Sequence, residues 1–254
     1  MADLKAEGIW PQLRQFTPAR IGLGRVGASV PTPALLAFDL AHARARDAVH
    51  ASLDSNALAA ELETQGFRPP LLIASQARDR MEYLLRPDRG RRLDADSRDR
   101  LRKRSATSVG PVIVIADGLS ALAVARHATP IMRELSGCWP GGSMADVPVA
   151  IARQGRVALG DEVGELLGAE TVVVLIGERP GLSSPDSLGA YFTWKPHVGR
   201  TDAERNCISN IRPEGLPYAE AASRLAWLLA EARRLRLSGI GLKDDSDEAE
   251  TLLL

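Results

Sequence analysis

The sequence has few cysteines, no long apolar run and no excess of either charge. Its two cysteines, Cys138 and Cys207, are too few for a disulfide framework and form no C-x-x-C pair. The longest apolar run, TVVVLI at 171–176, is far shorter than the roughly 20 residues of a transmembrane helix. Lys plus Arg and Asp plus Glu both total 32 in the 254 residues, so the net charge is zero. These absences predict a protein of a reducing compartment that binds neither nucleic acid nor a membrane surface by bulk charge.

Recognisable catalytic motifs are missing as well. The chain has no P-loop, no H-E-x-x-H, no G-x-S-x-G and no cysteine-rich metal-binding pattern. Its four histidines, His42, His50, His127 and His197, are scattered, and such histidines are more often structural or exposed than catalytic. We therefore assign no catalytic residue and no metal ligand, and the sequence favours a binding subunit over a self-contained enzyme.

One glycine pattern is present. Gly22, Gly24 and Gly27 have the G-x-G-x-x-G spacing of a dinucleotide-binding loop, with Asp39 at a plausible distance for a ribose-binding acid. Such a loop follows a strand and opens a helix, but PQLRQFTPA before it has no β-branched run, and the two prolines of ASVPTP oppose a helix start. We interpret the segment as an arm with glycine-permitted turns. A nucleotide-dependent oxidoreductase stays as the disfavoured alternative, which a failure to bind any dinucleotide in calorimetry would remove.

The N-terminal part of the chain is predicted to form an extended arm, residues 1–30, and a smaller helical subdomain, residues 31–105. The first helix is expected from Thr32, acting as its cap, and Pro33, at its first position, to about His50.

Shorter elements follow in the same subdomain. A helix is expected over 56–64, ended by Gly66, and a short strand over 71–74. The segment 76–104 is dense in arginine, but Asp and Glu interleave with it, so it is interpreted as a solvated helical face rather than a nucleic-acid patch. SATSVG, residues 105–110, is the predicted linker.

The remaining chain alternates strands with helices and is predicted to form an α/β domain over residues 106–242. Continuous apolar runs predict buried parallel strands at 111–116, 147–152 and 171–176. The predicted helices cover 119–136, the residues after Gly160 up to Gly168, and 217–237, with an edge strand at 190–194. The acidic tail, 243–254, is expected to be disordered.

This alternation is typical of a Rossmann-like, doubly wound, mostly parallel sheet. Such sheets bind ligands at the carboxyl ends of their strands. Those ends are predicted at Ala116-Asp117, Ala152-Arg153 and Gly177-Glu178. The turn GERPGLSS, which follows the third strand, is therefore expected to lie at the ligand-binding edge.

Four stretches together resemble one family, the small subunits of ethanolamine ammonia-lyase. They are TPARIGLGRVGASVPTPALLAFDLAHARARDAVH (17–50), GRVALGDEVGELLGAETVVVLIGERPGLSSPDSLGAY (155–191), CISNIRPEGLPYAEAA (207–222) and SGIGL (238–242). The resemblance runs from about residue 12 to 242. The glycine arm is thus identified as a segment of the family rather than as a nucleotide-binding fingerprint.

The resemblance implies a role in converting ethanolamine to acetaldehyde and ammonia by adenosylcobalamin-dependent radical chemistry. In the family, a large barrel subunit holds the substrate, and the small subunit packs against it and closes over the cobalamin. Equal numbers of both chains, six of each, are expected in the complex. The expected location is the bacterial cytoplasm, with a bacterial microcompartment as an alternative.

Three cofactor contacts carry over from the family motifs. They are Val157 in GRVALGD, Glu178 in IGERPGL and Cys207 at the start of CISNI. A carboxylate at a strand end can accept charge-assisted hydrogen bonds from corrin amides, whereas Val157 offers an apolar surface and Cys207 a weakly polar contact. The alternative for Val157 and Cys207 is plain core packing.

The chain also lacks the Asp-x-His-x-x-Gly motif with which some cobalamin proteins supply a histidine to cobalt. Base-on cobalamin binding, as in the family, is therefore expected, and a cobalt–histidine signature in the spin resonance spectrum would refute it. The alternative to a cofactor-contacting subunit is an assembly or scaffold protein that keeps the fold without the cofactor.

Overall fold

The computed structural model describes residues 8–104 and 110–246, which build a layered α/β body around one six-stranded sheet. The strand order across the sheet is β1-β3-β2-β4-β5-β6. The strands are β1 (Leu71–Ala74), β2 (Pro111–Ala116), β3 (Val149–Arg153), β4 (Thr171–Gly177), β5 (Leu188–Trp194) and β6 (Arg205–Ile211).

The sheet is mixed and mostly parallel. Strands β1, β3, β2 and β4 pair in parallel, while β5 is antiparallel to both β4 and β6. The predicted α/β class and the buried strands at 111–116, 147–152 and 171–176 are confirmed, with β3 starting two residues later than expected. The strand order differs from that of Rossmann dinucleotide-binding sheets, so the Rossmann-like part of the prediction is not confirmed.

The helices precede, connect and follow these strands. The α-helices are α1 (Trp10–Leu13), α2 (Thr32–His50), α3 (Ser55–Thr64), α4 (Arg80–Leu85), α5 (Ala95–Lys103), α6 (Ala121–Cys138), α7 (Leu159–Leu166) and α8 (Tyr218–Leu235). The short 3-10 turns are η1 (Arg14–Phe16), η2 (Arg89–Arg91), η3 (Met144–Asp146), η4 (Asp202–Glu204) and η5 (Gly239–Gly241).

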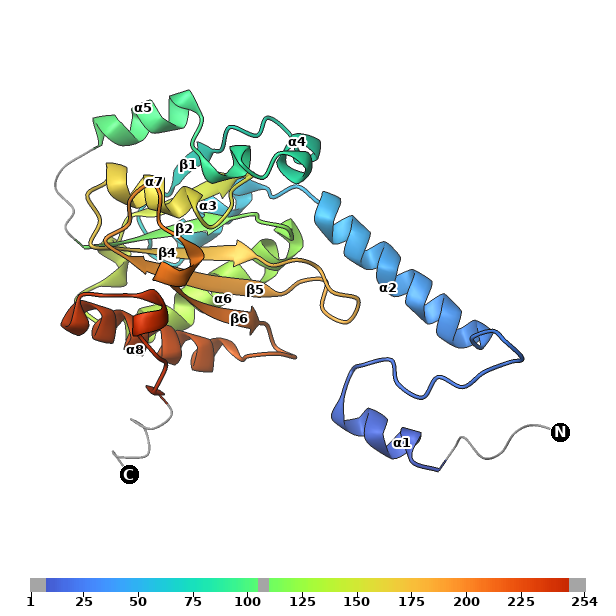
Figure 1. Cartoon of the computed structure of the whole chain (residues 1–254). Helices are drawn as coiled ribbons and strands as arrows, with labels where there is room; N and C mark the ends of the chain where they lie inside the picture. The colour runs from blue at the N-terminus through green and yellow to red at the C-terminus, as the bar shows by residue number, and fades with distance from the viewer. Residues whose placement is uncertain (1–7, 105–109, 247–254) are drawn as a thin grey trace.

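Helices cover both faces of the sheet, as Figure 1 shows. Because side chains alternate along a strand, Ile113 and Ile115 of β2 face one layer and Val112 and Val114 face the other. The first layer holds α3, α6 and α8, and the second holds α5 and α7. This two-sided burial explains why the central strands are continuous apolar runs in the sequence.

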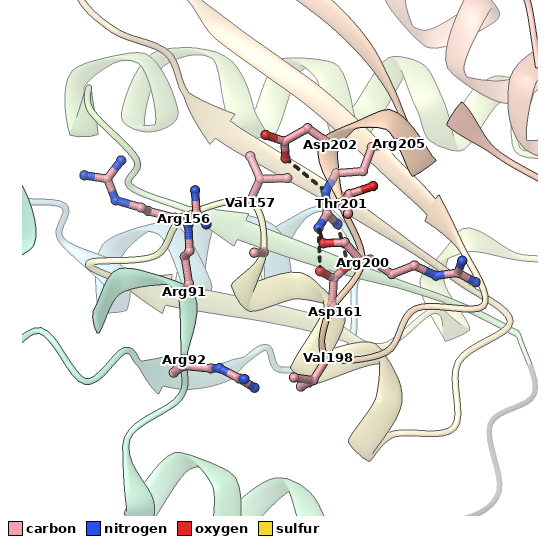
Figure 2. Close-up of a pocket in the computed structure, with 12 residues that line it drawn as sticks. Arg91, Arg92, Arg156, Val157, Asp161, Val198, Arg200, Thr201, Asp202 and Arg205 are labelled. Atoms are coloured by element: carbon pink, nitrogen blue, oxygen red, sulfur yellow. Dashed lines mark hydrogen bonds and ion pairs between the residues drawn. The ribbon is translucent and has the colours of Figure 1, made fainter. Parts of the chain in front are cut away.

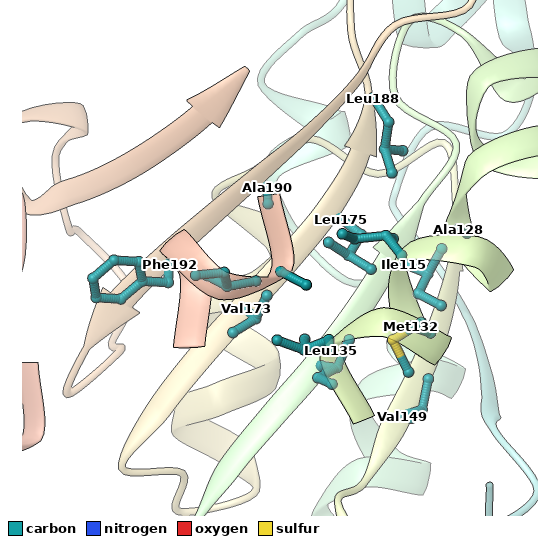
Figure 3. Packing of buried hydrophobic residues seen from close by; sticks show 14 of the residues in the cluster. Ile115, Ala128, Met132, Leu135, Val149, Val173, Leu175, Leu188, Ala190 and Phe192 are labelled. Atoms are coloured by element: carbon teal, nitrogen blue, oxygen red, sulfur yellow. The ribbon is translucent and has the colours of Figure 1, made fainter. Parts of the chain in front are cut away.

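The larger core lies between the sheet and α6 (Figure 3). Met132 and Leu135 of α6 are fully buried against Ile115, Val173 and Leu175. Each such side chain contributes roughly 1.5–3 kcal/mol through removal from water. This packing fixes the strands whose carboxyl ends form the predicted ligand edge.

The N-terminal arm leaves this body. Helix α2 projects away from the sheet, and the chain before it runs out to α1 (Figure 1). The expectation of an extended chain is wrong for Trp10–Phe16, which forms the helical turns α1 and η1 because Trp10 and Pro11 start a helix there. Thr32 is the first helical residue rather than the cap, which is Pro31.

The three glycines of the arm do have the backbone that only glycine adopts readily. Gly22, Gly24 and Gly27 have φ of 58°, 77° and 61°. A Cβ on Gly22 would lie 2.3 Å from Trp10 Cγ, so the arm folds back on α1 at this point. Between residue 8, where the described chain begins, and Gly22 there is no strand, which agrees with the interpretation as turns rather than as a dinucleotide loop.

The strand at 190–194 is not an edge strand, which corrects the prediction. It belongs to β5, and β6 pairs with its other side. Strand β6 reads RNCISNI, and its polar residues Asn206, Ser209 and Asn210 are only partly buried or exposed. Such a polar edge strand carries little apolar signal in the sequence.

Strand β1, within the range 31–105, pairs with β3 and so joins the same sheet as the later strands. The arginine-dense segment 76–104 forms α4, η2 and α5, and its arginines are mostly exposed, as expected for a solvated face. The proposed division at 30, 105 and 242 stays a prediction. Most of the linker 105–110, and the tail from 247 on, lie outside the described residues.

Candidate functional site

A cleft of about 440 Å³ opens at the carboxyl edge of the sheet, where a ligand was expected. Val157, from the loop after β3, and Glu178, directly after β4, both line it. Tyr83, Arg156 and Tyr191 line it as well. The structure therefore brings together two of the three predicted contact residues.

Glu178 is held by donors from two neighbouring segments. The hydroxyls of Ser187 and Ser209 each donate to its carboxylate, and the backbone N–H of Asn210 donates to Oε2 at 3.1 Å. Its own backbone N–H donates to the Ser187 carbonyl at 2.9 Å. Ionised carboxylates offer about four acceptor positions, so roughly one remains for a ligand. The charge is thus positioned before any ligand arrives.

The strand ends of β2 and β4 approach each other closely beside Glu178. A Cβ on Gly118 would lie 2.2 Å from the Gly177 carbonyl oxygen, and a Cβ on Gly177 would lie 2.0 Å from that of Ser120. Gly118 also has a φ of 56°. Both positions therefore require glycine, and their close approach fixes the position of Glu178, the residue that follows β4.

Asp117 fixes the loop that carries Val157. Its carboxylate is buried and accepts the backbone N–H groups of Gln154 at 2.9 Å and Gly155 at 3.1 Å. Burial raises the pKa of Asp117, opposed by these hydrogen bonds and by the charge of Arg80. Asp117 is a positioning residue, because it holds the loop and does not line the cleft.

Tyr83 contacts both the loop after β3 and the side chains of Arg80 and Arg156. It is buried, and its hydroxyl donates to the Gly155 carbonyl at 3.2 Å. The guanidinium groups of Arg80 and Arg156 lie over its ring, 4.8 and 4.6 Å from the centroid. Burial raises the pKa of Tyr83 to about 12, so the phenol is neutral at physiological pH.

Cys207 does not line the cleft, although the family motif predicted it as a contact. It is an exposed residue of β6, directly opposite Tyr191 on β5. Burial and then hydrogen bonding to Cys207 raise the pKa of Tyr191, which does line the cleft. Cys207 therefore contacts Tyr191, a residue that lines the cleft, and does not line the cleft itself.

A second cavity, of about 580 Å³, lies beside the first (Figure 2). Arg156 and Val157 line both cavities. On one side the second cavity is lined by Arg91 and Arg92, and on the other by the segment that ends in Arg205.

The far wall of this second cavity is built on a buried ion pair. Arg205 donates to both carboxylate oxygens of Asp161, at 2.5 and 2.7 Å, and both side chains are almost fully buried. Burial lowers the pKa of Arg205, but the hydrogen bonds and charge of Asp161 outweigh it and hold that pKa above its ordinary value. The pair joins α7 to β6 and is already neutralised within the chain.

None of the four histidines lines either cavity. His127 is buried in α6, where its Nδ1 lies 2.8 Å from the Tyr218 hydroxyl, and burial lowers its pKa. Among residues 8–104 and 110–246 no cluster of metal-ligating side chains occurs. In the same ranges, no helix combines the length and apolarity needed to traverse a bilayer.

Sequence reasoning missed Tyr83, Arg156 and Tyr191. Tyr83 and Arg156 come from different parts of the chain and meet only through the β1–β3 pairing. One signal was available, since Arg156 directly precedes the predicted contact Val157.

The comparisons with known proteins agree on one family. A sequence model described as "Ethanolamine ammonia-lyase light chain (EutC)" matches residues 7–243. A protein of Azotobacter vinelandii named "Ethanolamine ammonia-lyase small subunit" is 57% identical over 246 residues, covering 96% of this chain and 91% of the relative. Proteins with the same name from Pseudomonas aeruginosa (strain LESB58) and Ralstonia nicotianae are 55% and 56% identical, over 97% and 94% of this chain and 91% and 89% of theirs.

Proposed function

The chain belongs to the ethanolamine ammonia-lyase light-chain family, and we propose that it is the small subunit of an adenosylcobalamin-dependent enzyme converting ethanolamine to acetaldehyde and ammonia. The observation that carries the cofactor part of this proposal is the cleft at the sheet edge. There Val157 and a pre-positioned Glu178 face one open space.

The chemistry of the cleft fits a corrin ring. A corrin has an apolar macrocycle with amide side chains around its rim. Val157, Leu119 and Ile176 offer apolar surface, and Glu178 keeps roughly one acceptor position for an amide N–H. The Nε of Arg156 is buried without a hydrogen-bond partner among the described residues, and it can donate to an oxygen of a bound cofactor.

When bound, adenosylcobalamin would supply the radical that starts the reaction. This chain contributes binding, orientation and exclusion of water. Glu178 accepts from an amide of the corrin rim, and its three intramolecular hydrogen bonds keep that carboxylate from reorienting. Val157 packs against the macrocycle, and Cys207 acts by supporting Tyr191. None of the four histidines lines the cleft, which supports the expected base-on binding of the cofactor.

The large subunit is the proposed partner, in a complex of equal numbers of both chains, six of each. We assign its contact to the arm and helix α2. Leu35, Leu36, Phe38 and Leu40 of α2 are exposed large apolar side chains, as is Phe16 of the arm. Such an accumulation is typical of a protein interface.

The arm also lies next to the ligand edge. Arg20 Nη2 donates to the Leu182 carbonyl, in the turn after Glu178, at 3.5 Å. A partner that covers the arm would therefore reach the cleft and could close over its ligand. The proposed location is the bacterial cytoplasm, where the unpaired Cys138 and Cys207 stay reduced, or a microcompartment within it.

Replacement of Glu178 separates this proposal from that of a scaffold without cofactor contacts. In the complex with the large subunit, Glu178→Ala is expected to lower cobalamin affinity about tenfold, because a charge-assisted hydrogen bond is lost. Optical titration gives the affinity, and size-exclusion chromatography gives the assembly state. Glu63→Ala, which removes an exposed carboxylate of α3, is the control. Unchanged affinity with intact assembly would favour the scaffold.

A further inference from the structure

The second cavity contains positive charge that no carboxylate of residues 8–104 and 110–246 neutralises. Arg91 and Arg92, at the end of η2, are exposed, and no carboxylate of the described residues forms an ion pair with either. This is unusual here, because neighbouring arginines are paired: Arg86 with Asp88, and Arg89 with Glu82. Arg91 and Arg92 both line the cavity.

Arg156 adds a third guanidinium between the two cavities. Its Nη2 donates to the Tyr83 carbonyl at 3.2 Å, and its ring-stacked position is fixed by Tyr83. Its Nε is buried and has no partner in the parts of the chain that the structure describes. A buried guanidinium donor without an acceptor points to a ligand that supplies one.

The acidic side chains at this cavity do not cancel that charge. Asp161 is bound by both terminal nitrogens of Arg205. Asp202 lies 3.5 Å from Arg205 Nε and is 94% exposed, on the wall away from Arg91. The start of α7, where Ala158 gives no side-chain cap, adds the partial positive end of a helix dipole.

The two cavities therefore suit one ligand with two different parts. The first has apolar walls and a carboxylate. The second is lined by five arginines, of which Arg200 and Arg205 are paired with carboxylates and the other three are not paired with any described carboxylate, and Arg156 and Val157 are shared between the two cavities. Cobalamin combines a corrin rimmed with uncharged amides with a nucleotide tail that contains one anionic phosphodiester. Guanidinium groups are suited to phosphate oxygens through paired N–H donors.

We propose that Arg91, Arg92 and Arg156 form a subsite for the phosphodiester of the cobalamin nucleotide tail. This inference rests on the proposed function, because it presumes that the first cavity receives the corrin. It adds that this chain, rather than the large subunit alone, neutralises the charge of the tail.

The test compares two corrinoids on the complex of this chain with its large subunit. Cyanocobalamin carries the nucleotide tail, and dicyanocobinamide lacks it. Arg91→Gln and Arg92→Gln are made singly and together, and affinities are measured by optical titration at low and at high salt. Arg133→Gln, which removes an exposed arginine of α6 away from both cavities, is the matched control.

The double variant is expected to lose about tenfold or more in affinity for cyanocobalamin, as for charge-assisted hydrogen bonds, and to leave cobinamide binding unchanged. Its cyanocobalamin affinity should also depend less on salt, and inorganic phosphate at constant ionic strength should compete less well. Equal losses for both corrinoids, or none for either, would overturn the subsite while leaving the proposed function standing. Failure of the wild-type complex to bind cyanocobalamin would instead overturn both.

Discussion

At the scale of single residues, the site depends on side chains that hold backbone rather than touch a ligand. Asp117 is the main case, because its carboxylate bonds two N–H groups of the loop that ends in Val157. Glu178 was found from its motif, and its place at a strand end was predictable from β4. Two of the donors that fix Glu178, the Ser209 hydroxyl and the Asn210 backbone N–H, could not be predicted, because both belong to strand β6, whose apolar pattern is weak.

Replacement of Asp117 tests this positioning role. Asp117→Asn is expected to destabilise the chain by about 1–3 kcal/mol, because one of the two buried N–H groups loses its acceptor. Thermal unfolding of the complex measures the loss. Asp54→Asn is the matched control, since Asp54 accepts two backbone N–H groups, from Asn56 and Ala57, at the exposed start of α3.

The loss should depend on pH with a definite sign. Burial raises the pKa of Asp117 in the folded state, so folding favours its neutral form. This contribution is fully present below the ordinary pKa of aspartate and is lost as the pH rises through the folded-state pKa. The stability difference between wild type and Asp117→Asn should therefore shrink as the pH rises across that window. A difference that grows with pH would contradict the assignment.

At the scale of secondary-structure elements, the close approach of the carboxyl ends of β2 and β4 sets the geometry of the cleft. The apolar runs predicted both strands, because both of their faces are covered by helices. The close approach of Gly118 to Gly177 could not be predicted, since it depends on the register between two strands that α6, β3 and α7 separate in the chain.

Two glycines with positive φ, one at this close approach and one away from it, allow the role of the close approach to be tested. Gly118→Ala must place a methyl group against the Gly177 carbonyl, whereas Gly66→Ala, also at positive φ, meets nothing within 4 Å. Gly66→Ala is expected to cost about 1–2 kcal/mol from backbone strain alone. Gly118→Ala should cost about 1–3 kcal/mol more and weaken cobalamin binding as well. Equal melting temperatures for the two variants would show that the close approach of Gly118 to Gly177 does not require a glycine at position 118.

The sequence predicted the bounds of helix α2 but not its position relative to the sheet. Its bounds agree with the pattern, but its projection from the body leaves an apolar face uncovered, which no periodicity reveals.

Leu36→Ser and Leu40→Ser together are therefore expected to weaken association with the large subunit at least about tenfold, with little change in the fold. Analytical ultracentrifugation of the mixed subunits measures the association. Leu85→Ser, at an equally exposed leucine of α4, is the control and should leave association unchanged. Wild-type association by the double variant would exclude the face of α2 as the contact.

At the scale of the whole molecule, two features support the proposal that the chain works as a subunit. Its net charge is zero, and an apolar face is exposed on α2. Composition and motif content favoured a binding subunit, which stays a prediction. The two adjoining cavities appeared only in three dimensions, because their walls come from elements as far apart in the chain as α4, η2, α7, β4 and β5.

The most direct test of the central claim is reconstitution. The large subunit and this chain are purified separately and mixed with adenosylcobalamin, and acetaldehyde formed from ethanolamine is measured with and without this chain. We predict that activity requires both chains and reaches its maximum at equal amounts. Full activity of the large subunit alone would contradict the account.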